Sequence, residues 1–323
     1  SCLVTGGAGF IGSHVVRHLL ALGHRVRVAD DLSTGARANL DGVAGDVDFL
    51  QGDLAEPEVA ARAVAGTEVV FHLAALGSVP RSMRDPWGSH RANVNATVRL
   101  LEAGRAAGVR RLVFSSSSSV YGDTPTLPKV ESAEPLPRSP YAASKLAAEQ
   151  YVLSYARAGL VEGVALRYFN VFGPRQSPSG PYAAIIPILL RAAHLGEPAT
   201  LHGDGLQTRD FTYVDNVVSA NLLAGFGATE RVNAVVANVG AGGRTTLLDL
   251  VRLLARVSGR EIAVTHGPPR AGDVRDSLAS VARAEEALGY RVTMDVEEGL
   301  RRTWAWWMEE GARLHLGAET VRA

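Results

Sequence analysis

The first half of the chain alternates short apolar, β-branched runs with longer stretches in which apolar positions recur at helical spacing. The short runs predict strands at 2–5, 25–30, 47–51, 69–73, 111–116 and 163–168. The longer stretches predict helices at 11–22, 60–64, 89–107 and 141–158. Regular alternation of strand and helix is typical of a parallel, doubly wound sheet with right-handed crossovers, so we expect an α/β fold.

The pattern changes after residue 172. Residues 173–181 are rich in glycine and proline and predict a loop, and a second loop is expected at 267–276. Between these loops the elements are fewer, which predicts a smaller C-terminal substrate-binding region. We therefore expect residues 1–170 to form the sheet domain, with 210–240 returning to it, and 171–209 with 241–312 to form the smaller region. A closing helix at 296–309 should pack its tryptophans internally, and 313–323 should be a frayed tail.

Composition narrows the classes of function. The chain has 323 residues, with 33 basic and 33 acidic side chains, so it lacks the net charge expected of a nucleic-acid or anionic-membrane binder. No apolar stretch approaches the roughly 20 residues of a membrane span. Cys2 is the only cysteine, which excludes an internal disulfide, and we expect a cytoplasmic protein.

A glycine-rich turn, 6–12, follows the first predicted strand and opens the first predicted helix. In this context glycines permit a tight turn and a close approach to a pyrophosphate, as in Rossmann-type dinucleotide-binding domains. Asp30, at the end of the second strand, can bond both adenosine ribose hydroxyls and would repel a 2′-phosphate, so NAD is favoured over NADP. Asp53 can reach the adenine or cap the next helix, and His72 is expected to pack rather than react. The expected cofactor contacts are Gly6, Gly9, Phe10, Ile11, Gly12, Asp30, Asp53, Leu54, Leu73, Ala74 and Ala75.

A tyrosine and a lysine provide candidate chemistry. Tyr141 and Lys145 are one turn apart on one face of a predicted helix. The five-serine run 115–119 follows a buried strand and can place a hydroxyl beside Tyr141. A free tyrosine has a pKa of about 10, and we expect Lys145 and the positive nicotinamide of NAD to lower it. Tyr141 would then take a proton from a sugar hydroxyl while hydride leaves the carbon, with a serine relaying the proton.

Taken in order, these segments resemble the extended short-chain dehydrogenase/reductases, in the NAD-dependent epimerase/dehydratase family. More narrowly they resemble the nucleotide-sugar 4-epimerases of the UDP-galactose 4-epimerase group. The resemblance extends to about Trp307. It rests on the glycine turn, the serine run with Val120-Tyr121-Gly122, Tyr141-x-x-x-Lys145, Arg167-Tyr168-Phe169-Asn170-Val171-Phe172-Gly173, Gly203-Asp204-Gly205, Arg209-Asp210-Phe211 and Arg270-x-Gly272-Asp273.

The resemblance implies a role for particular residues. Ser117 matches the catalytic serine or threonine, Tyr141 the base, and Lys145 its activator and a nicotinamide-ribose ligand. Asn95 and Tyr168 match cofactor-region positions. Asn170 matches the residue that holds the diphosphate and sugar, and arginine suits phosphate through its bidentate fork. The residues that match ligands of the UDP phosphates and ribose are Arg209, Arg270 and Asp273.

The resemblance also implies a reaction and an assembly. NAD stays tightly bound and is not consumed while C4 of a UDP-sugar is oxidised, the 4-keto sugar turns, and hydride returns to the other face. Helices 89–107 and 141–158 would pair across a two-fold axis as a four-helix bundle in a homodimer. The residues expected on the exposed faces of these helices are Leu100, Leu101, Ala147, Tyr151 and Val152.

Departures from related families bear on the reaction. Sugar dehydratases and UDP-glucuronate decarboxylases carry an acidic residue just before the Val-Tyr-Gly, where this chain has Ser118 and Ser119. Elimination needs an acid and a base at C5 and C6, so epimerisation is favoured. A regulator that senses NAD and a net oxidoreductase are the remaining alternatives; the first is disfavoured because Ser117, Tyr141 and Lys145 are all present.

The sequence leaves three classes of UDP-sugar substrate open. Ser277 occupies a gate position at which a small residue admits an N-acetyl group, which favours UDP-N-acetylglucosamine/galactosamine or a range including UDP-glucose/galactose. UDP-glucuronate is the alternative, since the serine hydroxyls can hold a carboxylate. UDP-glucuronate 4-epimerases often have threonine at the position of Asn170 and arginine at the position of Ser177. The further expected substrate contacts are Ser78, Ser82, Ser117, Ser118, Ser119, Gln176, Ala184 and Ile185.

Overall fold

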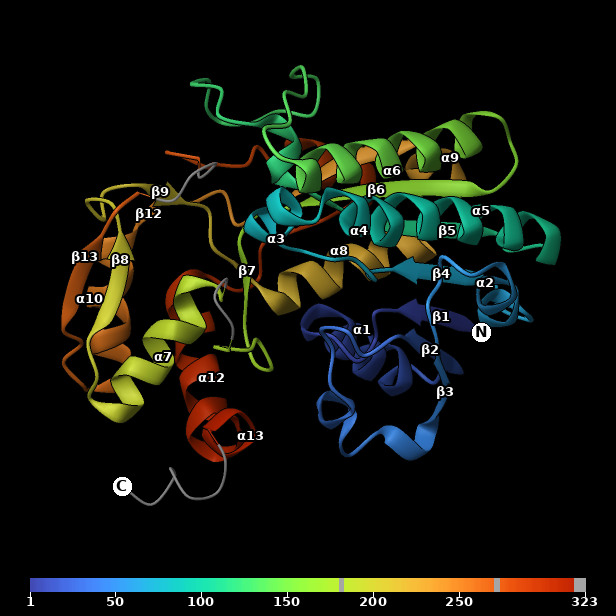
Figure 1. Ribbon diagram of the computed structural model, residues 1–323. Helices are drawn as coiled ribbons and strands as arrows, with labels where there is room; N and C mark the ends of the chain where they lie inside the picture. Colours follow the sequence, from blue (N-terminus) through green and yellow to red (C-terminus); the bar gives the residue numbers. More distant parts are fainter. Residues whose placement is uncertain (180–182, 270–273, 317–323) are drawn as a thin grey trace.

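A parallel sheet forms the centre of the molecule in the computed structural model, which describes residues 1–179, 183–269 and 274–316 (Figure 1). Within these residues the sheet has seven strands, and each neighbouring pair is parallel. The expected doubly wound α/β fold is confirmed. The strands are β1 (Cys2–Thr5), β2 (Val26–Asp30), β3 (Val47–Gln51), β4 (Val69–His72), β5 (Arg111–Ser117), β6 (Glu162–Tyr168) and β11 (Val235–Val239).

The strand order creates a crevice at the carboxyl ends of β1 and β4. The order is β11-β6-β5-β4-β1-β2-β3, so the chain winds outward from β1 in one direction and then restarts with β4 on its other side. Thr5 at the end of β1 is in register with Ala29 of β2 and His72 of β4. Crossover connections diverge at such a switch point, and ligands of doubly wound sheets bind in the opening that results.

Helices cover both faces of the sheet (Figure 1). Helices α1 (Phe10–Ala21) and α8 (Val214–Phe226) pack together on one face, and α2 (Pro57–Val64), α5 (Ala96–Ala107) and α6 (Pro140–Arg157) pack on the other. Side chains alternate accordingly, because successive strand residues point to opposite faces. Val4 packs in the core that contains α1, whereas its neighbour Leu3 packs in the core that contains α5.

This packing corrects the expected exposed faces of α5 and α6. Leu100, Leu101 and Val152 are buried in the core of their own chain, where they pack against the sheet. Tyr151 is exposed, as expected. A helix that covers a parallel sheet must bury its aliphatic stripe against that sheet, so these leucines and this valine do not face outward.

The segment before α5 is more broken than the single helix expected at 89–107. It comprises α3 (Val79–Arg84), α4 (Pro86–His90) and a π-helical turn, η3 (Arg91–Asn95), which runs directly into α5. The Asp85 side chain accepts a hydrogen bond from Gly88 N at 2.8 Å and caps α4. The π turn changes which side chains face the crevice, because it inserts an additional residue into the helical repeat.

The smaller region lies beyond the carboxyl ends of the strands (Figure 1). The chain enters it through β7 (Val171–Phe172) and leaves it through β10 (Thr212–Tyr213), and these two strands pair in parallel. The expected division into domains stays a prediction. The further elements of the smaller region are α7 (Ile185–Leu195), β8 (Ala199–His202), β9 (Thr208–Arg209), β12 (Thr245–Thr246), α10 (Leu247–Ser258), β13 (Val264–Gly267) and α12 (Val296–Trp306). Short elements elsewhere are η1 (Arg37–Leu40), η2 (Ala44–Asp46), η4 (Ser118–Tyr121), α9 (Thr229–Val232) and α11 (Ala282–Leu288).

The C-terminal segment differs from the frayed tail expected from residue 313. Helix α12 continues through η5 (Trp307–Gly311) into α13 (Ala312–Leu316), and residues 317–323 lie outside the described part. Trp307 is fully buried, and the His315 ring stacks on it with ring centroids 5.8 Å apart. Burial of these rings holds the extra turn in place, and the expected internal packing of the tryptophans is confirmed for Trp307. None of the described helices combines the length and apolar character needed to cross a membrane.

Candidate active site

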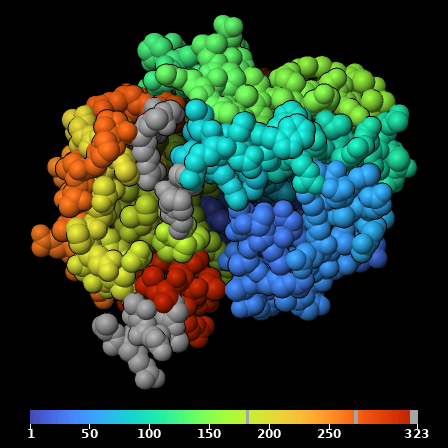
Figure 2. Space-filling model, viewed as in Figure 1, coloured from blue at the N-terminus to red at the C-terminus, as the bar shows by residue number. Residues whose placement is uncertain are grey.

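One cavity of about 490 Å³ runs along the carboxyl ends of β1, β4 and β5. Figure 2 shows a hollow in the middle of this face, with N-terminal residues in deep blue at its floor. The cavity brings together the glycine turn and the serine–tyrosine–lysine group, which are more than 100 positions apart in the chain. The expected residues that line it are Gly6, Gly9, Phe10, Ile11, Gly12, Asp30, Asp53, Leu54, Leu73, Ala74, Ala75, Ser78, Ser117, Tyr141, Lys145, Tyr168 and Asn170.

The glycine turn needs its glycines at two points. Gly6 has a φ of +66°, and a Cβ there would lie 2.7 Å from Ala74 N, so the turn after β1 touches the chain leaving β4. A Cβ on Gly12 would overlap the carbonyl oxygen of Gly6. No side chain caps the start of α1, whose N-cap residue is Gly9. The first backbone N–H groups of α1 are therefore available to a phosphate, as in dinucleotide sites.

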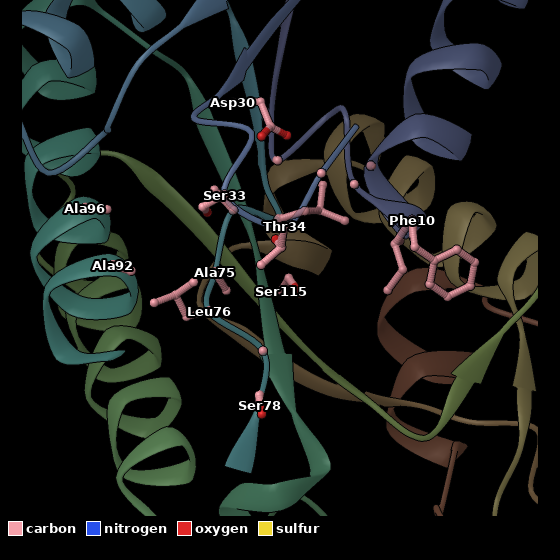
Figure 3. Close-up of a pocket in the computed structure, with 18 of the residues that line it drawn as sticks. Phe10, Asp30, Ser33, Thr34, Ala75, Leu76, Ser78, Ala92, Ala96 and Ser115 are labelled. Carbon is pink, nitrogen blue, oxygen red and sulfur yellow. The ribbon is translucent and has the colours of Figure 1, made fainter. Parts of the chain in front are cut away.

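Asp30 lies at the opposite end of the cavity from Ser78, with Ser33 and Thr34 between them (Figure 3). Its carboxylate accepts hydrogen bonds from Ala8 N (2.9 Å) and Leu32 N (2.8 Å), which ties the end of β2 to the glycine turn. Burial raises the pKa of Asp30, and these two bonds oppose the shift. An acceptor held here fits a ribose diol and disfavours a 2′-phosphate, so the cavity fits NAD.

The catalytic group is assembled from the end of β5 and the first turns of α6. The Ser139 hydroxyl caps α6 by accepting from Ala142 N at 3.1 Å, and Pro140 occupies the first turn, so the helix starts just before Tyr141. The Ser117 hydroxyl lies close enough to the Tyr141 phenol to lower its pKa. Lys145 Nζ donates to the Ser115 carbonyl at 2.8 Å. The expected proximity of serine, tyrosine and lysine is therefore found.

The electrostatics of this group differ from expectation. Burial raises the pKa of Tyr141, and only the neighbouring Ser117 hydroxyl opposes the shift. Burial also lowers the pKa of Lys145 to about 7, so at neutral pH its ammonium is only partly charged. The expected lowering of the Tyr141 pKa by Lys145 is wrong for the protein chain alone, because the buried lysine lacks the full charge that would stabilise a phenolate.

A second cavity of about 220 Å³ adjoins the first, and Asn170 and Val171 line both. The expected substrate residues Gln176, Ala184, Ile185 and Arg209 line this second cavity. Arg209 donates to the carbonyls of Thr208 (2.8 Å) and Arg275 (3.1 Å). Asn170 Nδ2 lies 3.5 Å from Ser277 Oγ, so the expected gate residue contacts Asn170, although Ser277 itself lines neither cavity. Arg270 and Asp273 lie outside the described residues.

Several expected contacts do not line either cavity. Asn95 lies in the π turn and does not line the cavity, whereas Ala92 and Ala96 do. Ser82 is buried and donates to the Val79 carbonyl at 2.7 Å, as a hydroxyl does inside a short helix. Ser118 and Ser119 also lie outside the lining, although the Ser119 hydroxyl donates to Ser117 Oγ at 2.9 Å.

Asp53 and His72 have different surroundings: Asp53 lines the cavity, whereas His72 is buried. Asp53 lines the cavity but forms an ion pair with Arg91, so part of its carboxylate is already used. It is not the N-cap of α2, which is Glu56. His72 is packed, as expected: it hydrogen-bonds the hydroxyls of Thr5 (2.7 Å) and Thr97 (2.9 Å), and burial lowers its pKa to about 3.

Part of the lining was not predicted from the sequence. The segment after β2 contributes Asp31, Ser33, Thr34 and Gly35, and the segment after β4 contributes Leu76, Gly77 and Arg81. Position alone was the available signal, since residues that follow the carboxyl ends of β2 and β4 line the crevice of a doubly wound sheet. Arg81 matters most chemically, because it brings a cation to the end of the cavity near Ser78.

Comparison with known proteins agrees with this geometry. Residues 2–240 match the model of the NAD dependent epimerase/dehydratase family. A UDP-glucose 4-epimerase of Mycolicibacterium smegmatis is 40% identical over 307 residues, covering 93% of this chain and 96% of that protein.

Solved structures match over nearly the whole chain. The UDP-N-acetylglucosamine 4-epimerase of Methanobrevibacter ruminantium M1, in complex with UDP-N-acetylmuramic acid, superposes with a TM-score of 0.90 at 38% identity, covering 96% of this chain and 98% of that one. The Thermus thermophilus UDP-glucose 4-epimerase complex with NAD gives a TM-score of 0.87 at 38% identity, covering 96% of this chain and 99% of that one. This chain therefore belongs to the NAD dependent epimerase/dehydratase family.

Proposed function

We propose that this protein is an NAD-dependent UDP-sugar 4-epimerase, an isomerase that inverts C4 of the sugar through a transient 4-keto intermediate. The observation that carries the proposal is the continuity of its two cavities. Asp30 and the glycine turn lie at one end, Ser117, Tyr141 and Lys145 lie further along, and Asn170 joins this space to the cavity that contains Arg209. The cavities therefore offer adjoining places for a dinucleotide, a reacting sugar and a nucleoside diphosphate.

The chemistry that NAD supplies when bound is reversible hydride transfer at its nicotinamide ring. Tyr141 takes the proton from the C4 hydroxyl as that carbon becomes a ketone, and it returns the proton after the sugar has turned. The form of Tyr141 that accepts this proton is the phenolate, which the neighbouring Ser117 hydroxyl stabilises and the positive nicotinamide of bound NAD would stabilise further. Lys145, anchored on Ser115, holds the first turns of α6 against β5 and so keeps the phenol in reach of the substrate.

An N-acetylated or plain hexose is the substrate class we favour, as UDP-N-acetylglucosamine/galactosamine or UDP-glucose/galactose. The small side chain of Ser277 supports this choice, since it contacts Asn170, the residue that lines both cavities. The relatives named above include both a UDP-glucose and a UDP-N-acetylglucosamine 4-epimerase.

UDP-glucuronate is the second candidate, and Arg81 is the observation that favours it. Its side chain is exposed and lines the larger cavity near Ser78, and within residues 1–179, 183–269 and 274–316 no carboxylate pairs with it. A guanidinium binds carboxylates in a bidentate manner. Replacing Arg81 with glutamine should therefore reduce turnover of UDP-glucuronate more than turnover of UDP-glucose; equal losses would contradict this role.

Incubation with a UDP-hexose in deuterium oxide tests the reaction itself. Because hydride leaves C4 and returns to it, the C4 epimer should contain no deuterium at C4. Incorporation at C4 would instead indicate deprotonation of the carbon and would overturn the mechanism. A 4-keto-6-deoxy product would indicate dehydration, which we disfavour because serines stand at 118 and 119.

We also propose that the protein is a cytoplasmic homodimer. The expected four-helix bundle cannot use Leu100, Leu101 or Val152, which are buried in their own chain. The same layer, however, exposes apolar side chains on α3, α4 and α6, which pack against one another: Met83 is 62% exposed, Trp87 67% and Tyr151 46%. We call these three residues the Trp87 patch and propose that a second copy of the chain covers it.

A further inference from the structure

Three consecutive serines at the end of β5 are each tied to a different turn of α6. The Ser115 carbonyl accepts from Lys145, and the Ser116 hydroxyl donates to Glu149 at 2.6 Å. The Ser117 hydroxyl lies near the Tyr141 phenol, whose pKa it lowers. Tyr141, Lys145 and Glu149 are spaced four residues apart and so share one face of the helix. Two of these ties involve the proposed catalytic group. The third is the hydrogen bond from Ser116 to Glu149, which lies one helical turn beyond Lys145.

The Glu149 carboxylate is fully buried and its position is determined from several sides. Its Oε2 accepts from Ser116 Oγ and from Arg167 Nε at 3.0 Å, and its Oε1 accepts from Arg167 Nη2 at 2.7 Å. The Arg167 guanidinium in turn lies over the Tyr121 ring, 4.7 Å from its centroid. The carboxylate therefore has little freedom to follow Ser116 if β5 shifts.

A buried ion pair of this kind is not explained by stability alone. Burying two charges is costly, and apolar replacements of such pairs are often neutral or stabilising. Here the pair joins the end of β6 to the third turn of α6, and Ser116 connects the end of β5 to it. Strand β5 presents Ser117 and helix α6 presents Tyr141. Its position suggests a role in the geometry of those two side chains.

We propose that Glu149, held by Arg167, is a positioning residue for catalysis: by binding the Ser116 hydroxyl it sets where the next residue, Ser117, meets Tyr141. Glu149 contacts neither substrate nor cofactor in this role and acts through Ser116. The inference rests on the proposed epimerase function for its kinetic consequence, although its geometric consequence does not depend on which reaction is catalysed.

Replacing Ser116 with alanine removes its hydrogen bond to Glu149 with the smallest change in the core. Because displacements of about 1 Å can cost up to about a hundred-fold in rate, we expect S116A to lower kcat by roughly ten- to a hundred-fold. KM should change by less than about two-fold, since substrate binding elsewhere is intact. Glu149→Gln should give the same pattern, and the Ser116→Ala/Glu149→Gln double variant should be little worse than either single one. Ser116→Thr retains the hydroxyl and should recover most of kcat.

A matched control lies at the other end of the same two strands. Arg111, at the start of β5, is fully buried and pairs with Glu162 at the start of β6, with Nη2 and Oε2 2.6 Å apart. Glu162→Gln should lower the melting temperature but leave kcat unchanged. Loss of kcat in Glu162→Gln equal to that in Ser116→Ala would mean that any damage to the sheet is sufficient, and the proposal would be wrong.

Crystal structures of the wild type and Ser116→Ala decide the geometric claim without turnover. We expect the Ser117 hydroxyl to move relative to the Tyr141 phenol by more than roughly 0.5 Å, a displacement large enough to matter in an active site. An unmoved Ser117 would overturn the proposal, even if Glu149→Gln fails to fold. If the wild type does not epimerise any UDP-sugar, the proposed function fails, while these structures still test the positioning role.

Discussion

Lys145 donates a hydrogen bond from Nζ to the backbone carbonyl of Ser115, over 2.8 Å. The bond joins α6 to the end of β5, two residues before the proposed catalytic serine, Ser117. It is formed by a buried lysine whose pKa burial lowers to about 7. The same burial that orients the side chain therefore makes its charge sensitive to pH near neutrality.

Stability should depend on pH through Lys145. Its pKa is lowered from 10.5 to about 7 on folding, so between these values the unfolded chain binds more protons than the folded one. Stability contributed by this group consequently rises with pH across that window, and the burial penalty is complete below pH 7. In NAD-free protein, the melting temperature of the wild type should rise relative to Lys145→Met between about pH 7 and 9. Parallel melting curves across this range would contradict the lowered pKa.

Turnover should depend on the Tyr141 and Ser117 hydroxyls. Tyr141→Phe and Ser117→Ala should each lower kcat by about 10²- to 10⁴-fold, the usual contribution of a positioned acid–base group. Circular dichroism should be unchanged, because neither hydroxyl supports the core. Tyr151→Phe, an exposed change on the same helix, serves as the control and should retain full activity. Full activity in Tyr141→Phe would rule out the proposed base.

Cofactor choice should depend on Asp30. Asp30→Ser should weaken NAD binding by about ten-fold, the equivalent of one lost charge-assisted hydrogen bond, and should remove the discrimination against NADP. Asp31→Ser is the matched control, since Asp31 bonds Ser33 rather than the glycine turn. Titration of NAD-free protein with each dinucleotide measures both effects. Equal changes in the two variants would indicate a general charge effect instead of a specific ribose contact.

Association should depend on the Trp87 patch. A homodimer should have about twice the 34.1 kDa mass of the chain in light scattering. Trp87→Glu should reduce that mass toward the monomer value, because a charge would have to be buried in the interface. Leu206→Glu changes another exposed apolar residue, on the smaller region, and should not affect the mass. A wild-type particle of only 34.1 kDa at micromolar concentration would refute the dimer.

Strand–helix alternation was sufficient to predict the fold and the cofactor end of the site. Each strand from β1 to β6 lies within a residue or two of its expected position, because short apolar runs bounded by helices have few other solutions. Gly6 and Asp30 follow from their places at the ends of β1 and β2. A serine hydroxyl beside Tyr141 was predicted from the serine run that ends a buried strand, and the resemblance then singled out Ser117.

Other features depend on tertiary contacts that no local pattern encodes. Asn95 lies in the π turn η3 and does not line the cavity, and an inserted residue leaves no periodic signal in so short a segment. Leu100 was expected outside because an aliphatic stripe can cover a sheet or a second subunit equally well. The low charge of Lys145 and the ion pair of Glu149 both arise from burial, which only the assembled core defines.

A C4-epimerisation assay of the purified protein is the decisive experiment for the proposed function. UDP-N-acetylglucosamine, UDP-glucose and UDP-glucuronate are incubated separately without added NAD, and products are resolved by anion-exchange chromatography. We expect the C4 epimer of at least one of these sugars, produced by cofactor that remains bound to the protein. The absence of any epimer, even after NAD is added, would contradict the proposed function.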